Sequence, residues 1–142
     1  MRVLIFGFFM LVGVTGCATS PIPTSAAQNV PADRIFRMKQ IPRNGNAQAT
    51  FVRDVGFTGS GVSDHLFIDG AKAASLNPGE KVEFVLPPGE HIFGVVPTDP
   101  FGTHSLNTID QELKAGKVYF YRIQTDGNSF RTVLQRFIPD PE

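Results

Sequence analysis

The amino-acid sequence predicts an all-β fold, a small antiparallel β-sandwich of about eight short strands with one short N-terminal helix. Thirteen Phe, fourteen Gly and eleven Pro among 142 residues favour short strands joined by many turns. Turn dipeptides at Asp69-Gly70, Pro78-Gly79 and Pro88-Gly89 separate apolar segments of strand length. In residues 81–86 every second residue is apolar, which is typical of a strand with one face in a core.

The order of the expected elements follows from the same signals. They are a helix over residues 32–40, a strand over residues 48–54, a β-meander within residues 66–93, and strands over residues 91–97, 105–113, 117–125 and 129–137. In the helix, Ile35 or Phe36 packs on the sandwich, and Pro42 prevents its continuation. Residues 117–125 are apolar on both faces, which predicts a central strand.

The meander also carries a family resemblance. It contains Ile68-Asp69-Gly70 after an apolar residue, then a Pro-Gly turn, then the run from Leu86 to Phe93 with its Pro-Pro-Gly-Glu-His sequence. In this order residues 49–137 resemble PEGA-type small β-sandwich domains and a related, largely uncharacterised family of bacterial lipoproteins. The shared motifs are turns, so the resemblance implies the fold and implies no catalytic residues.

The N-terminal residues predict a lipoprotein signal peptide over residues 1–16. Arg2 precedes an apolar run over residues 3–14, which is short for a permanent span and has the length of a secretory h-region. The run ends in Val14-Thr15-Gly16-Cys17, which resembles the lipobox of bacterial prolipoproteins. That resemblance implies that Cys17, the only Cys of the chain, is acylated and becomes the new N-terminus. The alternative is an ordinary signal peptide in which Cys17 is incidental.

The rest of the chain is expected to form a tether and one domain. Residues 17–31 begin with the lipidated Cys17 and continue in Pro, Ser, Thr and Ala, which predicts a flexible tether. Residues 32–142 then form a single β-sandwich domain. Two or three acyl chains would anchor the protein permanently to a membrane. By the resemblance to sorted Gram-negative lipoproteins, Ala18 favours the periplasmic side of the outer membrane; in a Gram-positive organism the anchor lies on the outer face of the cytoplasmic membrane.

Charge and side-chain chemistry exclude several functions. Thirteen basic and thirteen acidic residues give no net charge, which argues against nucleic acid and against an anionic membrane surface as partners. The possible metal ligands lack a recognisable spacing, so we expect no metal and no cofactor. These ligands are His65 with Asp64, His104 with Asp99, and His91.

The sequence also offers no convincing catalytic group. Ser60 lies between two Gly residues but lacks the pattern of a nucleophile elbow. Asp110 and Glu112 share a strand face about 7 Å apart, a spacing that fits glycosidase chemistry and fits a solvated face equally well. We therefore expect no enzymatic activity.

The remaining prediction is a binding module. Phe57 and Phe101 lie on Gly- and Pro-flanked loops, where a rigid sandwich presents contact residues; the alternative is that both rings fold back onto the core. We expect a membrane-anchored envelope lipoprotein that acts as a non-catalytic binding or accessory module, with an envelope protein or a glycan as partner. The alternatives are a structural envelope spacer and a periplasmic metal-binding protein or hydrolase.

Overall fold

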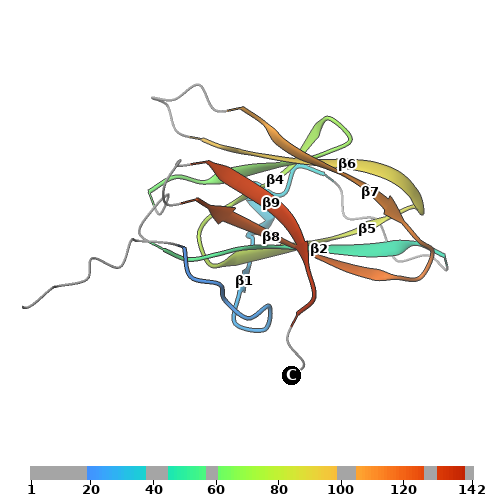
Figure 1. The fold of residues 1–142 in the computed structure, drawn as a ribbon, viewed down its shortest axis with the longest axis horizontal. Coiled ribbons are helices and arrows are strands. Elements are labelled where there is room, and N and C mark those ends of the chain that lie inside the picture. The colour runs from blue at the N-terminus through green and yellow to red at the C-terminus, as the bar shows by residue number, and fades with distance from the viewer. Residues whose placement is uncertain (1–18, 38–44, 57–60, 99–104, 127–130, 140–142) are drawn as a thin grey trace, which may run out of the picture.

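A computed structural model describes residues 19–37, 45–56, 61–98, 105–126 and 131–139. These residues form two β-sheets packed face to face (Figure 1). The strands are β1 Gln28–Asn29, β2 Ala47–Arg53, β3 Asp64–Ile68, β4 Ala71–Leu76, β5 Glu80–Leu86, β6 Gly89–Pro97, β7 Asn107–Leu113, β8 Val118–Thr125 and β9 Thr132–Phe137. The all-β prediction is confirmed, and the described residues form nine strands where about eight were expected.

The strand order corrects two details of the prediction. One sheet has the order β1-β5-β2-β8-β9, and the other has the order β4-β3-β6-β7. Two pairings are parallel, β1 with β5 and β2 with β8, so the sandwich is not purely antiparallel. The predicted meander is also wrong, because β5 crosses to the other sheet between β4 and β6. Turn residues mark where a strand ends, and they carry no information about which strand becomes its partner.

Four aromatic rings form the centre of the core between the sheets. Phe51 of β2 stacks on Tyr121 of β8, with ring centroids 5.0 Å apart. Phe93 of β6 meets Phe51 edge-on at 5.1 Å, and Phe84 of β5 lies 6.4 Å from Phe51. All four side chains are buried. The rings come from both sheets, so this cluster holds the two layers together.

Strand alternation is confirmed where it was predicted most strongly. Val82, Phe84 and Leu86 of β5 are buried, while Glu83 between them is exposed. The central position of β8 is also confirmed, since β8 lies between β2 and β9.

The turn at Asp69-Gly70 is confirmed and is held by a histidine. Asp69 has a φ of 53° and Gly70 a φ of 77°, the left-handed conformation that this dipeptide accepts. The Ile92 amide donates to Asp69 Oδ1 at 3.0 Å, and His91 Nδ1 lies 2.8 Å from Asp69 Oδ2. Burial opposes ionisation of Asp69, yet these hydrogen bonds lower the pKa of its carboxyl below the ordinary value. His91 Nε2 also lies 2.9 Å from the Pro87 carbonyl, so His91 links the Asp69-Gly70 turn to the segment that precedes β6.

The segment predicted as a flexible tether packs on the domain where the structure describes it, over residues 19–31. The Ser20 amide donates to the Val55 carbonyl at 2.6 Å, and the Val55 amide donates back at 3.3 Å. Further along, β1 pairs with the start of β5, and Ala27 and Val30 are buried. Two small buried apolar side chains and a few backbone hydrogen bonds therefore hold this segment on the domain, although its composition includes few large apolar residues. Val52, which points away from the core between the sheets, is fully buried on the side where this segment runs.

The prediction of a helix over residues 32–40 is wrong where the structure describes the chain. The structure has a 3-10 turn over Ala32–Arg34, after which Ile35 pairs with Ala74 of β4. The Phe36 amide donates to the Ala73 carbonyl at 2.8 Å, and Ile35 packs partly on the core as expected. The backbone follows the open edge of β4 because pairing there satisfies groups that a short isolated helix would leave at its ends. Residues 38–40 and Pro42 lie outside the described residues.

Both open sides of the sandwich are closed by these connections. On one side, β1 pairs with β5 while residues 35–37 bond to β4. On the other side, the Leu134 amide of β9 donates to Asn107 Oδ1 of β7 at 3.0 Å. Among the described residues, no helix has the length and apolar character needed to cross a membrane.

Candidate functional site

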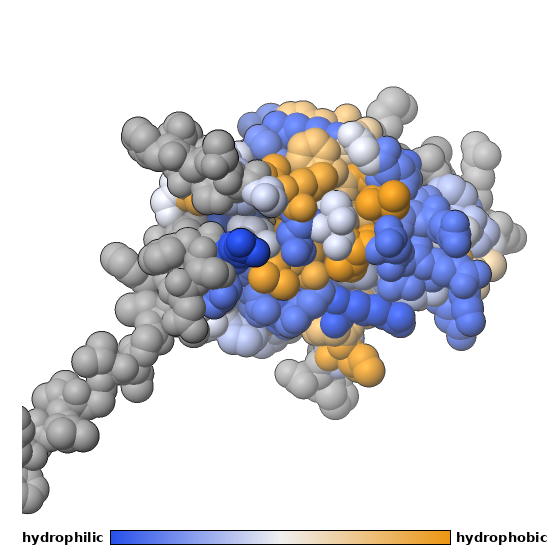
Figure 2. Space-filling model, turned by 45° about the horizontal axis from the view of Figure 1, so that its top comes forward, coloured by the Kyte–Doolittle hydropathy of each residue, from blue (hydrophilic) through white to orange (hydrophobic). Residues whose placement is uncertain are grey.

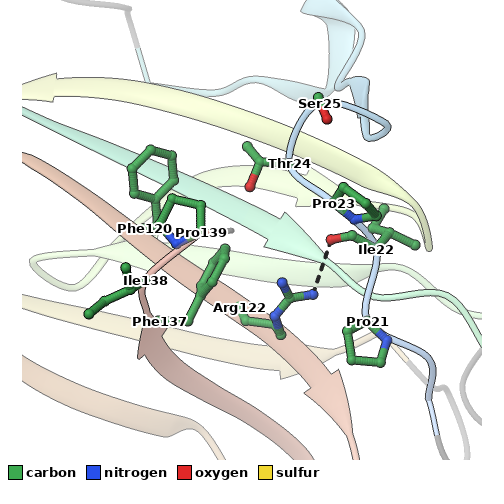
Figure 3. A pocket seen from close by; sticks show the side chains of 10 residues that line it. All are labelled: Pro21, Ile22, Pro23, Thr24, Ser25, Phe120, Arg122, Phe137, Ile138 and Pro139. Atoms are coloured by element: carbon green, nitrogen blue, oxygen red, sulfur yellow. Dashed lines mark hydrogen bonds between the residues drawn. The ribbon is translucent and has the colours of Figure 1, made fainter. Parts of the chain in front are cut away.

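A groove of about 520 Å³ lies on the outer face of the five-stranded sheet, between the N-terminal segment and the C-terminal residues (Figure 3). Its lining consists of Pro21, Ile22, Pro23, Thr24, Ser25, Phe120, Arg122, Phe137, Ile138 and Pro139. Most of these side chains are apolar, and Arg122 supplies the charge. The groove therefore combines an apolar wall with one guanidinium.

Side chains along β8 alternate between the two faces of the sheet, and the outward ones form the floor of the groove. Tyr119, Tyr121 and Ile123 enter the core, so Phe120 and Arg122 point to the opposite face. Phe137 of β9 is the register partner of Phe120, and the two rings meet edge-on with centroids 6.0 Å apart. The Arg122 guanidinium lies 4.2 Å from the centroid of the Phe137 ring. Two neighbouring strands thus supply an aromatic surface with a cation against it.

Arg122 is held by a buried carboxylate and by the N-terminal segment. Its Nη1 donates to Asp54 Oδ1 and, at 3.3 Å, to the Ile22 carbonyl (Figure 3). The Ile22 amide lies 3.4 Å from the same carboxyl oxygen of Asp54. Burial raises the pKa of Asp54, although its hydrogen bond to Arg122 opposes that shift. The N-terminal segment is therefore fixed to the sheet through Ile22, which gives the groove its second wall.

The lining residues offer apolar and polar contacts for a ligand. The lining contains no carboxylate, histidine or cysteine that could transfer a proton or attack a substrate. Proline, isoleucine and phenylalanine side chains offer apolar contact. Arg122 and the hydroxyls of Thr24 and Ser25 offer directional polar contact. Such a lining suits a ligand with apolar side groups and a small number of hydrogen-bond acceptors.

Figure 2 shows apolar residues, in orange, gathered in the middle of one face with hydrophilic residues around them. The large apolar side chains that the described part of the chain exposes are Phe36, Ile92, Leu106, Val118 and Ile138. Ile138, at the rim of the groove, is 91% exposed. An exposed apolar side chain beside an apolar groove extends the available contact surface.

The sequence-predicted site residues Cys17, Phe57 and Phe101 lie outside the described residues, as do Ser60, Asp99 and His104. The described residues that flank the two Phe loops lie at the same end of the sandwich, since Asp64 is the register partner of Pro97. At that end the Thr98 amide donates to the Ser63 carbonyl at 2.8 Å. Whether the two rings contact a partner or the core stays a prediction.

The histidines within the described residues have partners other than a metal. Lys72 Nζ lies 3.0 Å from His65 Nε2, and burial together with this cation lowers the pKa of His65. His91 bonds to Asp69 and to Pro87, as described above. In the described part of the chain, no group of three or more His, Cys, Asp and Glu side chains could hold a metal ion.

Other ionic contacts link elements of the fold. Arg53 of β2 and Asp64 of β3 form a buried ion pair between the two sheets, with Nε and Oδ2 2.7 Å apart. Thr132 of β9 donates to Asp64 Oδ1 at 3.2 Å. Arg34 holds Glu80 through two hydrogen bonds of 2.7 and 2.5 Å, which tie the 3-10 turn to β5. These carboxylates neutralise structural cations and do not line the groove.

The predicted carboxylate pair lies away from the groove. Asp110 and Glu112 are both exposed on β7, the edge strand of the four-stranded sheet. Glu112 is the register partner of Glu90, so another carboxylate faces it across the strands. Exposed carboxylates on an edge strand fit a solvated face, and charge there also discourages pairing with another chain.

Comparison with models of known protein families and with curated protein sequences found no match. The resemblance to PEGA-type domains and bacterial lipoproteins therefore stays a prediction for family and function.

The groove itself was missed by sequence reasoning. Residues 117–125 were predicted to form a central strand because apolar residues lie on both faces, and the charged Arg122 on the face of Phe120 is the signal that could have indicated a surface site. The opposite wall comes from residues 21–25, which are about a hundred positions away in the sequence from β8. No local pattern records that contact.

Proposed function

We propose that this chain is a membrane-anchored envelope lipoprotein whose β-sandwich acts as a non-catalytic binding module. The observation that carries the binding role is the groove between the N-terminal segment and β8 and β9, with its apolar lining and Arg122. The preferred partner is an envelope protein that inserts apolar side chains beside a carbonyl or carboxylate. A glycan that stacks on Phe120 or Phe137 is the alternative partner.

The anchoring part of the proposal rests on the leader sequence. An apolar run followed by Val14-Thr15-Gly16-Cys17 resembles the leader and lipobox of bacterial prolipoproteins. Acyl chains contribute about 0.8 kcal/mol for each buried methylene, so two chains suffice for stable anchoring.

The groove favours binding over the other classes. A spacer needs a rigid body and no concave apolar surface, whereas this domain has both the groove and exposed Ile138 at its rim. A hydrolase needs a nucleophile or activated water beside a base, and the described polar clusters are engaged in linking strands. Each ionic cluster of this kind supports the fold rather than a reaction.

We expect Cys17→Ser to abolish lipid attachment. Labelled palmitate should enter the wild-type protein and be absent from the variant, which should accumulate as the uncleaved precursor because lipid transfer precedes cleavage in this class of leader. Fractionation with gel analysis measures both effects. As the matched control, Ser20→Ala lies near the cleavage site and should be labelled normally. Normal processing and membrane recovery of Cys17→Ser would contradict the anchoring.

We expect the groove to lie next to its partner in the intact envelope. A photo-crosslinking amino acid at Ile138 should yield a discrete adduct, because this side chain is exposed at the rim. The same group at Ile92, 51% exposed on the outer face of the other sheet, should not form that adduct. Phe120→Ala should weaken the adduct from position 138 by about tenfold, since one aromatic contact accounts for roughly 1.5 kcal/mol. Equal adducts from positions 138 and 92, or an adduct indifferent to Phe120→Ala, would refute the groove as the site.

A further inference from the structure

We infer that the end of the sandwich at which the N-terminal segment enters lies against the bilayer that holds the acylated Cys17. We call this the entry end; it contains Thr19, Ser20, Val55, Gly56 and the end of β8 at Thr125. The inference rests on the proposed anchoring, and it adds an orientation and a lipid-facing surface that anchoring alone does not require.

The first observation is that the chain is fixed to the domain almost immediately after Cys17. Thr19 Oγ1 donates to the Thr125 carbonyl at 3.3 Å, and Ser20 forms its backbone pair with Val55. A Cβ on Gly56 would lie 2.8 Å from the Thr19 Cα, so the two backbones are in close contact. Only Ala18 separates Cys17 from these contacts.

The second observation is the reach of that connection compared with the length of the domain. Two Cα steps span at most about 8 Å, which is all the separation available between Cys17 and Thr19. The eight residues of β8, Val118–Thr125, span roughly 25 Å from the opposite end to the entry end. The opposite end therefore cannot reach a bilayer that holds Cys17 unless residues 19–31 leave the sheet.

The topology gathers several strand ends at the entry end. Register pairs place the end of β6 beside the start of β3 and the end of β8 beside the start of β9. In Figure 1 these strand ends lie at the left, where the described chain begins in blue. The surface between them includes half-buried Val62 and Leu106, which is 49% exposed. Apolar side chains of this kind are accommodated in the headgroup region of a bilayer.

Among the described residues, exposed charged side chains are also fewer at the entry end than at the opposite end. The exposed charged residues at the entry end are Asp126 and Arg131, of opposite sign, while Glu80 nearby is bonded to Arg34. The opposite end carries a larger exposed set, namely Asp69, Lys72, Glu90, Glu112, Lys114 and Lys117. Among the described residues, placing the opposite end in the headgroups would strip water from six exposed charges, whereas the entry end would lose water from two.

The test is a depth measurement on the full-length, acylated lipoprotein in phosphatidylcholine vesicles. A nitroxide is attached at Ser105→Cys, exposed at the entry end, or at Ala115→Cys, exposed at the opposite end. Cys17 does not react with the label because its thiol is acylated. We expect nickel-chelate collisions to be about threefold or more rarer at position 105 than at position 115, with oxygen collisions showing the opposite trend.

Two comparisons make the outcome decisive. A Gly-Ser insertion of about twelve residues between Ala18 and Thr19 adds a reach of roughly 20 Å and should equalise the two labels while the protein still floats with the vesicles. Equal chelate access at both positions in the uninserted protein, or lower access at position 115, overturns the orientation while leaving the anchoring intact. Protein that fails to float with the vesicles instead overturns the anchoring, and the orientation with it.

Discussion

Arg53→Ala is expected to destabilise the domain by about 3–5 kcal/mol, a large part of the stability of a typical domain. The two side chains of the Arg53–Asp64 pair are 3% and 1% exposed, so removal of the cation leaves a buried carboxylate without its counter-charge. Arg53 Nη1 also donates to the carbonyls of Val62 and Leu76 at 2.7 Å each, and both acceptors lose this donor. Burial lowers the pKa of Arg53, and the nearby Asp64 carboxylate opposes that shift.

Urea unfolding of residues 18–142, followed by circular dichroism, measures this effect. Arg34→Ala is the matched control, because the Arg34–Glu80 pair is partly exposed and its loss should cost about 1 kcal/mol. The double variant Arg53→Met with Asp64→Leu should regain much of the loss, since apolar residues of similar size remove the buried charge altogether. A loss for Arg53→Ala no greater than that for Arg34→Ala would show that the pair is not what joins the sheets.

Phe51→Ala is expected to lower stability by about 3–5 kcal/mol and the melting temperature by about 10 °C or more. The Phe51 ring contacts Tyr121 on its own sheet and Phe93 on the other, with centroids 5.0 and 5.1 Å away. Its removal leaves a cavity at the point where the sheets meet, and the surrounding strands are too constrained by pairing to fill it.

Thermal unfolding of the same chain tests this prediction. Phe36→Ala provides the control, because the Phe36 ring is 50% exposed and contacts Lys72 Nζ at 4.5 Å. Its replacement should cost less than about 1 kcal/mol. Phe51→Leu should fall between the two, since it restores part of the lost volume. Similar melting temperatures for Phe51→Ala and Phe36→Ala would contradict the central place of Phe51 in the core.

A comparison of Phe51 with Phe120 shows why part of the site could not be predicted from the sequence. Phe51 lies in the predicted strand over residues 48–54, but local periodicity did not decide which face of that strand enters the core, and its neighbours Thr50 and Val52 are buried as well. Phe120 lies in a strand with apolar residues on both faces, and only the pairing of β8 with β9 shows that it forms a groove with Phe137. A local pattern describes the two faces of a strand and does not say what covers each face.

The N-terminal segment shows the same limit. Its composition of small residues and prolines predicted a free tether, because few apolar side chains were available for burial. In the fold, an unpaired edge of β5 and the buried Asp54–Arg122 pair provide backbone and polar partners that the composition does not reveal. The N-terminal segment can bind this edge with little apolar area, because β5 already holds its backbone donors and acceptors in position for pairing.

The sequence by itself determined the all-β class, the face of β5 that enters the core and the turn at Asp69-Gly70. Each depends on neighbouring residues, either through strand periodicity or through the backbone freedom of Gly. Only the tertiary structure decided the parallel pairing of β2 with β8, the packing of residues 19–31 and the groove around Arg122. These features join segments up to a hundred residues apart, and their free energy comes from contacts that exist only after the sheets have formed.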